Sequence, residues 1–348
     1  MFKLEKHAVS TAQSALAELA STHVAVLSVL NGTSQGDIWV DHRPNPEVAI
    51  VVIGDMYFLA GELKPAEHSL ERIWAIIPDW AYLYCEDHWG PFLDQVWSNK
   101  YALPHPRLRF GFASGNPLPE LIQPPAGFEF VPIDRNLFNR NPGNLDLFRR
   151  AVEEWRSPDA FFENAVGVCA LHNKQIVSHC LTDSVCGSRC EIGVRTSSKY
   201  RRLGLAQAAA SATIHACLQR GIADIEWHTH ASNKGSIATA KSIGLTELDR
   251  YTAYSCRLPA ENIGDLGSAY CAELATHFEQ ASADINWCRF PAAGASVMAG
   301  DNQRALDNIR LLLESDWQGQ TAWLENFWAL QPLHKDPEFQ VLISRRQK

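Results

Sequence analysis

The chain has no long hydrophobic run. Nothing in its 348 residues approaches the roughly 20 consecutive apolar residues that a helix needs to cross a bilayer. The first residues, Met1 to His7, also lack the apolar core of a signal peptide. These two absences exclude a membrane partner at this stage, and we expect a cytoplasmic protein.

Positive charge is also scarce. Lys and Arg number 31 against 39 Asp and Glu, which gives a formal net charge of −8. A protein that holds nucleic acid by its phosphates needs a basic face, and the sequence contains no cluster of basic residues that would build one. We therefore expect no nucleic-acid partner, and a small or cationic partner fits the charge better.

Several sequence motifs are missing as well. There is no Gly-x-x-x-x-Gly-Lys-Ser/Thr run and no Gly-x-Gly-x-x-Gly, so two common nucleotide-binding loops are excluded. The nine cysteines include no paired Cys-x-x-Cys spacing. An odd number of scattered cysteines suits a reducing compartment, and we interpret Cys169, Cys180, Cys186 and Cys190 as small hydrophobic strand residues and expect no metal.

The most informative stretch runs from Cys190 to Ala206 and continues as an Ala-rich segment to about Arg220. A β-leaning run is followed by the pattern Arg201-x-x-Gly204-x-Ala206, and then by helix formers with no Gly or Pro before Gly221. This order predicts a strand, a loop and a helix N-terminus. The free N–H groups of such a terminus bind anions, and a glycine allows close approach, so we expect the loop to hold a pyrophosphate.

The residues after this stretch strengthen the interpretation. A second strand-like run, Asp224 to His230, precedes Asn233 and a short helix that ends at Gly244. This order of parts, over roughly residues 126–258, resembles the GNAT superfamily of N-acetyltransferases. The resemblance implies an α+β GNAT fold with a mixed, mostly antiparallel sheet.

In that superfamily the loop binds the pyrophosphate of acetyl-coenzyme A (acetyl-CoA), and the Asn contacts its pantetheine arm. The fourth and fifth strands separate, so that the pantetheine pairs with them like another strand. Carried over residue by residue, the resemblance implies acetyl-CoA as cosubstrate, without a metal, and a cofactor site made of Val194, Arg195, Thr196, Arg201, Arg202, Leu203, Gly204, Leu205, Ala206 and Asn233.

Two residues are candidates for catalysis. An alkylamine has a pKa of about 10.4, so acetyl transfer to it requires a base or a water relay at neutral pH. Glu191 lies on the expected fourth strand, where many superfamily members carry a glutamate. His228 would share a sheet face with Glu226 and His230 if the strand is regular. Glu191 could instead be a solvent-facing or ion-paired strand residue.

Two further features of this site stay open. His228 could be an ordinary edge histidine bonded to backbone. Many superfamily members also carry a tyrosine seven residues after the Asn, which protonates the departing thiolate, and this chain has Ala240 there. Tyr251 or Tyr254 could take that role, or the thiolate leaves without a dedicated acid.

The chain divides at a Pro- and Gly-rich passage over residues 103–127, which is interrupted by a strand-like run at 108–112. We expect an N-terminal α+β domain over 1–125, a GNAT-like unit without the loop, then the acetyltransferase domain over 126–258, then a helical domain over 259–348. The expected N-terminal elements are strands at 23–30, 36–40, 48–53, 56–60 and 81–85, helices at 10–19, 67–77 and 91–98, and a hairpin turn at Asn31-Gly32.

In the acetyltransferase domain a closing strand at 247–257 is expected to complete the sheet. In the last domain Gly300-Asp301 followed by Ala305 resembles the turn of a tetratricopeptide repeat, although only one such unit is visible. This tail could pack on the acetyltransferase body or offer a groove to a protein partner.

The sequence therefore predicts an acetyl-CoA-dependent N-acetyltransferase that acts by direct attack of a primary amine on the thioester. The acceptor would be a small-molecule or peptide amine. The alternative is a non-catalytic sensor that binds acyl-CoA and acts on a partner through the helical tail.

Overall fold

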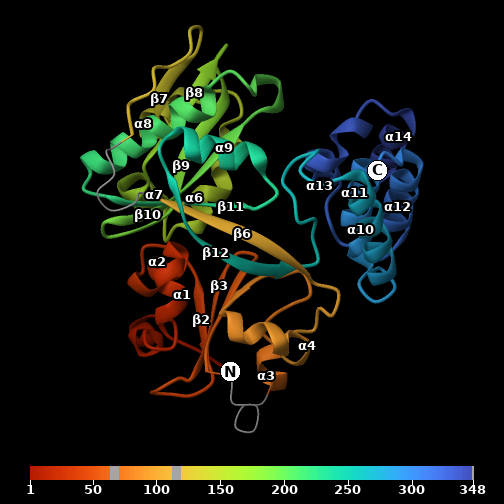
Figure 1. The fold of residues 1–348 in the computed structure, drawn as a ribbon, viewed down its shortest axis with the longest axis horizontal. Coiled ribbons are helices and arrows are strands. Elements are labelled where there is room, and N and C mark those ends of the chain that lie inside the picture. Colours follow the sequence, from red (N-terminus) through yellow and green to blue (C-terminus); the bar gives the residue numbers. More distant parts are fainter. Residues whose placement is uncertain (63–69, 112–118, 347–348) are drawn as a thin grey trace.

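A single mixed sheet runs through the body of the protein (Figure 1). The computed structural model describes residues 1–62, 70–111 and 119–346. Within these residues the sheet has twelve strands in the order β1-β2-β3-β4-β5-β12-β6-β11-β10-β9-β8-β7. The N-terminal half contributes β1 (Phe2–Lys3), η1 (Lys6–Ala12), α1 (Ala17–Thr22), α2 (Val24–Asn31), β2 (Asp37–Val40), β3 (Val48–Ile53), β4 (Met56–Gly61), α3 (Leu70–Trp74), β5 (Tyr82–Cys85), η2 (Asp87–Phe92), α4 (Leu93–Val96) and β6 (Leu103–Gly111).

The second half of the body repeats this order of strands and helices. It comprises β7 (Glu129–Pro132), α5 (Arg135–Arg140), η3 (Leu145–Phe148), α6 (Arg149–Glu154), α7 (Pro158–Asn164), β8 (Gly167–His172), β9 (Gln175–Cys186), β10 (Arg189–Thr196), η4 (Ser198–Tyr200), α8 (Leu205–Gln219), β11 (Asp224–His230), α9 (Lys234–Ser242) and β12 (Thr246–Ser255). Most of the elements expected in this half are present, with boundaries shifted by a few residues.

The two halves exchange their last strands. β6 leaves the N-terminal half and pairs antiparallel with β11, while β12 pairs with β5. β6 and β12 then pair with each other along the middle of the sheet. The expectation that the strand at 247–257 completes the C-terminal sheet is therefore wrong, because β6 occupies the place beside β11. The run at 108–112, which we expected to interrupt a linker, belongs to this central strand as far as residue 111.

The expected strand at 23–30 is also wrong, because the structure forms helix α2 there. A short apolar run carries no period that separates a helix from a strand, and α2 is buried on more than one side. Asn31-Gly32 is not a hairpin turn either: Gly32 ends the helix in the left-handed region, at φ +77°. Residues 67–69 of the expected helix at 67–77 lie outside the described residues, and α3 forms part of the rest.

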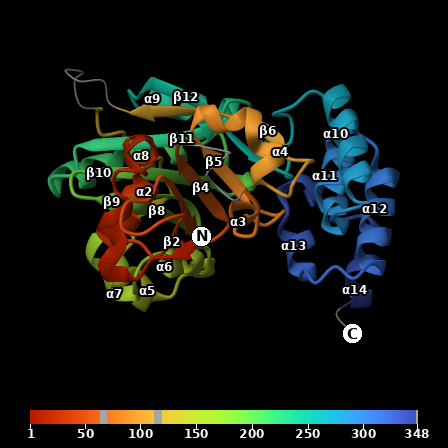
Figure 2. The ribbon, with the colours of Figure 1, turned by 90° about the horizontal axis from the view of Figure 1, so that it is seen from below.

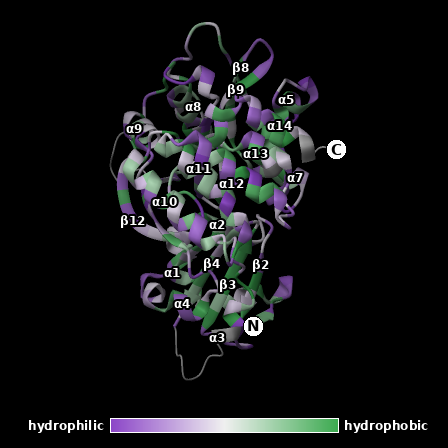
Figure 3. Ribbon diagram, turned by 90° about the vertical axis from the view of Figure 1, so that its right-hand side faces the viewer, coloured by the Kyte–Doolittle hydropathy of each residue, from purple (hydrophilic) through white to green (hydrophobic). Residues whose placement is uncertain are grey.

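Helices cover both faces of the sheet around β9 and β10. α8 packs on one face, against β8, β9 and β10, and its apolar residues join a core with Ile225 and Trp227 of β11. α2 packs against β9 and β10 as well, and α1 lies beside it (Figure 1). The strands of the N-terminal half are strongly hydrophobic (Figure 3), and β3 has all six residues at least half-buried. The N-terminal half is thus well packed, and its helix α2 also covers β9 and β10 of the other half.

The helical tail lies beside the start of β6 and the end of β12, the two strands in the middle of the sheet (Figures 1 and 2). Cys256 and Leu258 share an apolar cluster with Leu274 and Phe278 of the tail, so the two parts are packed together. Within the described part of the chain, no helix is long and apolar enough to span a bilayer. The tail consists of α10 (Ser268–Ala281), η5 (Asn286–Cys288), α11 (Arg289–Ala299), α12 (Asn302–Glu314), α13 (Thr321–Asn326), η6 (Trp328–Leu333) and α14 (Pro337–Arg346).

The turn noted in the sequence joins α11 to α12. Gly300 ends α11 with φ +91°, and the Asp301 side chain accepts a hydrogen bond from the N–H of Arg304 at 3.0 Å. Ala305 is fully buried in the first turn of α12. The likeness to a tetratricopeptide repeat remains a prediction.

The strand exchange predicts how the protein responds to being cut between its halves. Separate chains of residues 1–125 and 126–348 should each aggregate, because β11 loses β6 and β5 loses β12, and both then present unpaired edges. Co-expression should restore one 1:1 complex with the circular-dichroism spectrum and unfolding midpoint close to those of the intact chain. A monomeric 126–348 fragment that unfolds cooperatively by itself would contradict the exchange.

Candidate active site

Strands β10 and β11 separate partway along their length. They pair in parallel only at Arg189↔Asp224, Cys190↔Ile225 and Glu191↔Glu226. β10 continues to Thr196 paired with β9, and β11 continues to His230 paired with β6. The His228 side chain is 1% exposed although the residue as a whole is half-buried, so its main chain carries the exposure. Within the described residues, backbone groups on the facing edges of the two strands therefore have no strand partner beyond Glu191.

The loop predicted to bind an anion follows the separated part of β10. Arg202 and Gly204 both adopt left-handed backbone conformations, with φ +67° and +77°, and α8 begins at Leu205. The N-cap residue of this helix is Gly204, which has no side chain to cap the first N–H groups. Arg201 and Arg202 are exposed, and the Arg201 Nε donates to the carbonyl oxygen of Thr196 at 3.3 Å. The loop thus brings cationic side chains and a helix N-terminus together.

The remaining predicted cofactor residues lie along the same edge. Val194 and Thr196 are half-buried on β10, Arg195 is exposed between them, and Leu203 and Ala206 flank Gly204. Asn233 follows β11 and caps α9: its Oδ1 accepts from the N–H of Ser236 at 2.9 Å. Its amide nitrogen donates to the Glu261 carboxylate. Asn233 therefore stands near the end of β11, as expected, with its side chain already bonded to its own chain.

Carboxyl groups gather where β10 leaves β11. Glu191, the predicted catalytic residue, is half-buried at the last β10–β11 pair. Asp183 of β9 lies close by, and the sequence analysis did not single it out. Burial raises the pKa of Asp183 well above its usual range, and the neighbouring Glu191 and Glu154 raise it further. Asp183 stands between Thr182 and Ser184 in the sequence, so no local pattern marked it out.

A buried carboxylate holds the base of the separated strands together. Glu226 accepts a hydrogen bond from Arg189 at 2.6 Å and lies 3.6 Å from an Arg109 nitrogen. Burial would raise the pKa of Glu226, but the bonds from His228 and Arg189 outweigh burial and lower it. Arg189 also donates to the carbonyl oxygens of Ala20 and Ser21, at the end of α1. The N-terminal half is thereby tied to β10 and β11 at the site.

His228, the second predicted catalytic residue, is enclosed by this network. Its Nε2 lies 3.1 Å from Glu226 Oε2, and its Nδ1 lies 2.8 Å from the Tyr251 hydroxyl. Both ring nitrogens therefore have protein partners, and the ring packs 5.6 Å from that of His23. β11 pairs with β6 in unbroken register from Glu226 to His230, so Glu226, His228 and His230 lie on one face of the sheet, as expected for a regular strand. Because both ring nitrogens are bonded to the protein, His228 could act on an acceptor only through the Tyr251 hydroxyl.

Tyr251 belongs to this site, whereas Tyr254 packs in the core of the N-terminal half. Burial raises the pKa of Tyr251, the nearby Arg107 opposes this rise, and Glu191 adds to it. Ala240, which stands where many relatives have a tyrosine, is fully buried. Tyr251 is therefore a phenol that stays protonated at neutral pH and lies within the field of Glu191.

A second buried polar group lies further along the same strands. Burial, with a smaller effect of the adjacent Arg107, lowers the pKa of His230 to about 2 and that of His105 to about 3. His230 Nε2 lies 3.5 Å from the Tyr82 hydroxyl and 3.9 Å from Glu261. These histidines are neutral in the folded protein, and they line the junction between the two halves.

The corresponding strands of the N-terminal half do not separate. All four residues of β5 pair with β4, from Met56↔Tyr82 to Leu59↔Cys85. At the end of β4 the Gly61 carbonyl accepts from the Trp89 indole at 3.1 Å, and its N–H donates to Glu86 at 2.9 Å. The residues after Glu62, up to 69, lie outside the described part of the chain. In the described part of the chain, β10 and β11 separate, whereas β4 and β5 stay paired along all of β5.

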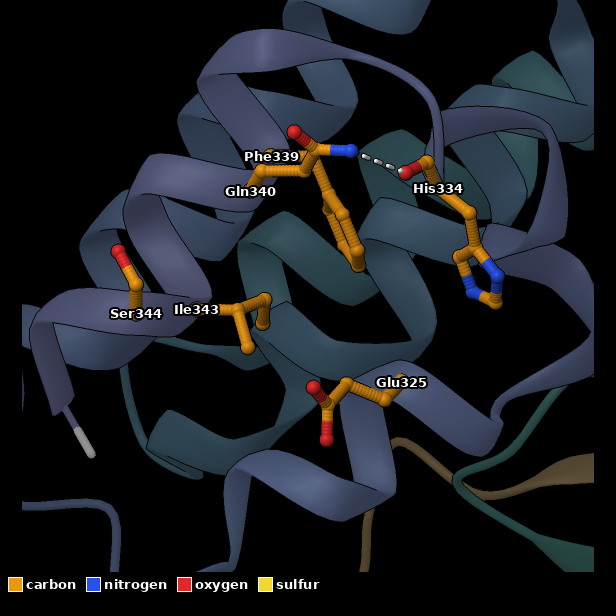
Figure 4. A pocket seen from close by; sticks show the side chains of 6 residues that line it. All are labelled: Glu325, His334, Phe339, Gln340, Ile343 and Ser344. Carbon is orange, nitrogen blue, oxygen red and sulfur yellow. Dashed lines mark hydrogen bonds between the residues drawn. The ribbon is translucent and has the colours of Figure 1, made fainter.

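The tail carries a shallow pocket of its own, with a volume of about 360 Å³ (Figure 4). It lies between α13, η6 and α14 and is lined by Glu325, His334, Phe339, Gln340, Ile343 and Ser344. The Gln340 amide spans its rim to the His334 carbonyl oxygen at 3.1 Å. These residues are mixed in polarity. Among the described residues, no group of three or more His, Cys, Asp or Glu is arranged to hold a metal.

Comparison with known proteins identifies the class of this fold and site. A profile of the GNAT acetyltransferase family matches residues 15–254, which include both halves of the sheet. The match covers more than half of the chain, and the chain therefore belongs to the GNAT acetyltransferase family. It is an N-acetyltransferase with an α+β fold, and enzymes of this family use acetyl-CoA as cosubstrate.

Individual relatives agree with this assignment. The chain is 29% identical over 236 residues to the uncharacterized N-acetyltransferase YdfB of Bacillus subtilis. The matched region covers 66% of this chain and 88% of that protein. It also resembles the crystal structure of a GCN5-related N-acetyltransferase-like protein from Streptococcus suis, with a TM-score of 0.55 and 24% identity. That likeness covers 72% of this chain and 98% of the other, and it concerns the fold.

The buried neutral histidines predict a pH dependence of stability. The folded pKa of His230, about 2, lies below its unfolded value near 6.5, so its contribution is complete above pH 6.5 and is lost as the pH falls. His230→Gln should reduce the slope of unfolding free energy against pH by about 1.4 kcal/mol per unit between pH 6 and 4. Urea titrations at three pH values measure this slope.

The exposed His7, changed to Gln, controls for the loss of an imidazole. His105→Gln tests the same effect at a second position, where the folded pKa is about 3. If the slopes of both buried-site variants equalled that of the parent protein, the two histidines would not be neutral in the fold.

Proposed function

We propose that the protein is an acetyl-CoA-dependent N-acetyltransferase that moves an acetyl group to a primary amine by direct attack on the thioester. One observation carries the proposal: the β10–β11 ladder ends at Glu191↔Glu226, and the separated part of β10 leads to a left-handed loop that opens α8. A pantetheine arm would pair with the open edges, and the pyrophosphate would lie on the helix N-terminus. Val194, Arg195 and Thr196 supply the strand edge, and Asn233 lies at its far end.

The loop residues fit a pyrophosphate for electrostatic reasons. The N–H groups of Leu205 and Ala206 begin a 15-residue helix whose positive end faces the loop. Arg201 and Arg202 are exposed beside it and can reach phosphate oxygens from the solvent side. Gly204 leaves the backbone open there, because the nearest atom to an added Cβ would be a Pro125 carbon at 3.8 Å.

The chemistry follows from the groups around the end of the ladder. A protonated amine is attracted by Glu191 and must lose a proton before its nitrogen attacks the acetyl carbon. The new N–C bond forms as the C–S bond breaks, and the thiolate departs. Tyr251, protonated and bonded to His228, is the group that supports thiolate departure, with Glu226 orienting the imidazole. The carboxyl groups at this point favour a cationic acceptor, either a small molecule or a peptide amine.

A pair of glycine substitutions tests the cofactor site. Gly204 and Gly221 lie at opposite ends of α8 with almost equal φ values, +77° and +78°, and neither is crowded. Gly204→Glu should abolish acetyl-CoA binding, because a carboxylate would enter the pyrophosphate path. Gly221→Glu imposes the same backbone strain away from the loop and should bind like the parent protein. Isothermal titration calorimetry with acetyl-CoA measures both.

Equal affinities in the two variants would exclude this loop as the pyrophosphate site. Saturable binding without thiol release on any amine would instead contradict transfer, and would leave an acyl-CoA sensor as the function.

A second substitution tests the acceptor side. Glu191→Gln should lower kcat by about 10²-fold or more with acetyl-CoA affinity unchanged, because it removes the charge that faces the amine and leaves the loop intact. Thiol release monitored with a chromogenic disulfide gives kcat, and calorimetry gives the affinity. Unchanged turnover would remove Glu191 from the site.

A further inference from the structure

Strand β9 contains one extra residue beside the site. Glu191 of β10 pairs with Ser184, and the next residue, Ile192, pairs with Thr182. Asp183 is therefore the additional residue of a β-bulge, a feature that redirects a side chain out of the regular alternation. The bulge lies at the same level as the last β10–β11 pair, where the strands begin to separate.

The Asp183 carboxyl occupies the place of a missing side chain on β10. A Cβ added to Gly193 would lie 2.5 Å from Asp183 Oδ2 and 3.2 Å from its Cγ. Gly193 is two residues beyond Glu191 on the same strand, so both acidic side chains stand on one face, next to each other. The absence of a side chain at Gly193 is what allows the carboxyl to lie over the strand.

We propose that Asp183 is the base that takes the proton from the acceptor amine, and that Glu191 beside it holds the positive charge of that amine. The proposal rests on the acetyl transfer proposed above and assigns the two carboxyl groups different tasks. Asp183 lies over the first residues of β10 that have left β11, where the thioester of a bound cofactor would lie.

The electrostatic surroundings suit this role. Asp183 is exposed to solvent as a residue, yet enough protein surrounds its carboxyl for burial to raise its pKa well above the usual range. Glu191 on β10 and Glu154 at the end of α6 raise it further. α2, which packs on β9 and β10, has no titratable side chain between Val24 and Asn31. A raised pKa makes the Asp183 carboxylate a stronger base toward an ammonium group than an ordinary aspartate.

The other titratable groups nearby lie beside Glu191 or toward the far end of β10. Tyr84 and Tyr251 are close enough to Glu191 for its charge to raise their pKa values, after the larger effect of burial. Arg195 lies two residues beyond Gly193 and lowers the pKa of His179, again after burial. Asp183 thus has carboxyl groups as its charged neighbours.

The proton balance of the step is complete. The ammonium gives one proton to the Asp183 carboxylate, and the free amine attacks the acetyl carbon. The tetrahedral adduct expels the thiolate, which takes the second amine proton and leaves as the thiol. The product is the amide, and Asp183 returns its proton to solvent before the next turnover.

Two variants separate position from charge. Asp183→Asn removes the base, and Gly193→Ala displaces the carboxyl without removing it, because the new methyl group would overlap Oδ2. Asp159→Asn, at an exposed residue of α7 bonded to Arg135, is the matched control. The probes are butylamine, butane-1,4-diamine, glucosamine and triglycine, each with acetyl-CoA, and thiol release is followed from pH 5.5 to 9.

With the best of these acceptors, Asp183→Asn should lower kcat about 100-fold or more, and Gly193→Ala should also lower kcat. Acetyl-CoA affinity should stay within about twofold of the parent protein in both variants. Glu191→Gln should move the acidic limb of the pH profile to lower pH by about one unit, since a negative neighbour of Asp183 is lost. Asp183→Asn should lose that limb.

Three results overturn the inference. If the parent protein releases no thiol with any of the four amines, the proposed function itself fails, and the role of Asp183 fails with it. If the parent protein is active and Asp183→Asn retains its kcat and its acidic limb, the inference alone fails. If Asp183→Asn loses acetyl-CoA affinity and catalysis together, Asp183 has a structural role and is not the base.

Discussion

The pairing of β6 with β11 is the constraint on which the site depends. β11 is released from β10 after Glu226, and a strand released on one edge needs a partner on the other to remain in place. β6, supplied by the opposite half of the chain, is that partner. β12 pairs with β5 in the same way. The sheet therefore continues through both halves, and neither half is complete without the other.

The buried Glu226 fixes the point at which the two strands part. A carboxylate in this position is costly unless it is paired, and Arg189, Arg109 and His228 surround it. Because Arg189 also bonds the last carbonyl groups of α1, the same network holds the N-terminal half over the site. The N-terminal half thus covers the site and supplies part of its polar network, while its own strands β4 and β5 remain paired.

Much of the cofactor side of the site could be predicted because its signals are local. A β-leaning run, a glycine and an uninterrupted helix lie within thirty residues, and the strand, the left-handed Gly204 and α8 follow directly. The strand exchange could not be predicted in this way. Pro104 and Pro106 suggested a linker, whereas β6 pairs with β11 only from Arg107 onward and tolerates prolines before it.

Other features depended on tertiary packing or on register. The segment 23–30 is helical because burial from several directions outweighs the strand preference of its valines. The sequence analysis did not single out Asp183, and only the jump from Ser184 to Thr182 opposite β10 shows that it stands out of the alternation of β9. The Tyr251 partner of His228 likewise comes from β12, which the sequence placed elsewhere in the sheet.

A crystal structure of the protein with acetyl-CoA and an unreactive acceptor analogue tests the central claim most directly. The account predicts pantetheine density between β10 and β11 beyond the Glu191↔Glu226 pair, with the acetyl group over Gly193 and the acceptor nitrogen beside Asp183 and Glu191. Cofactor density between β4 and β5, or in the pocket of the helical tail, would contradict it.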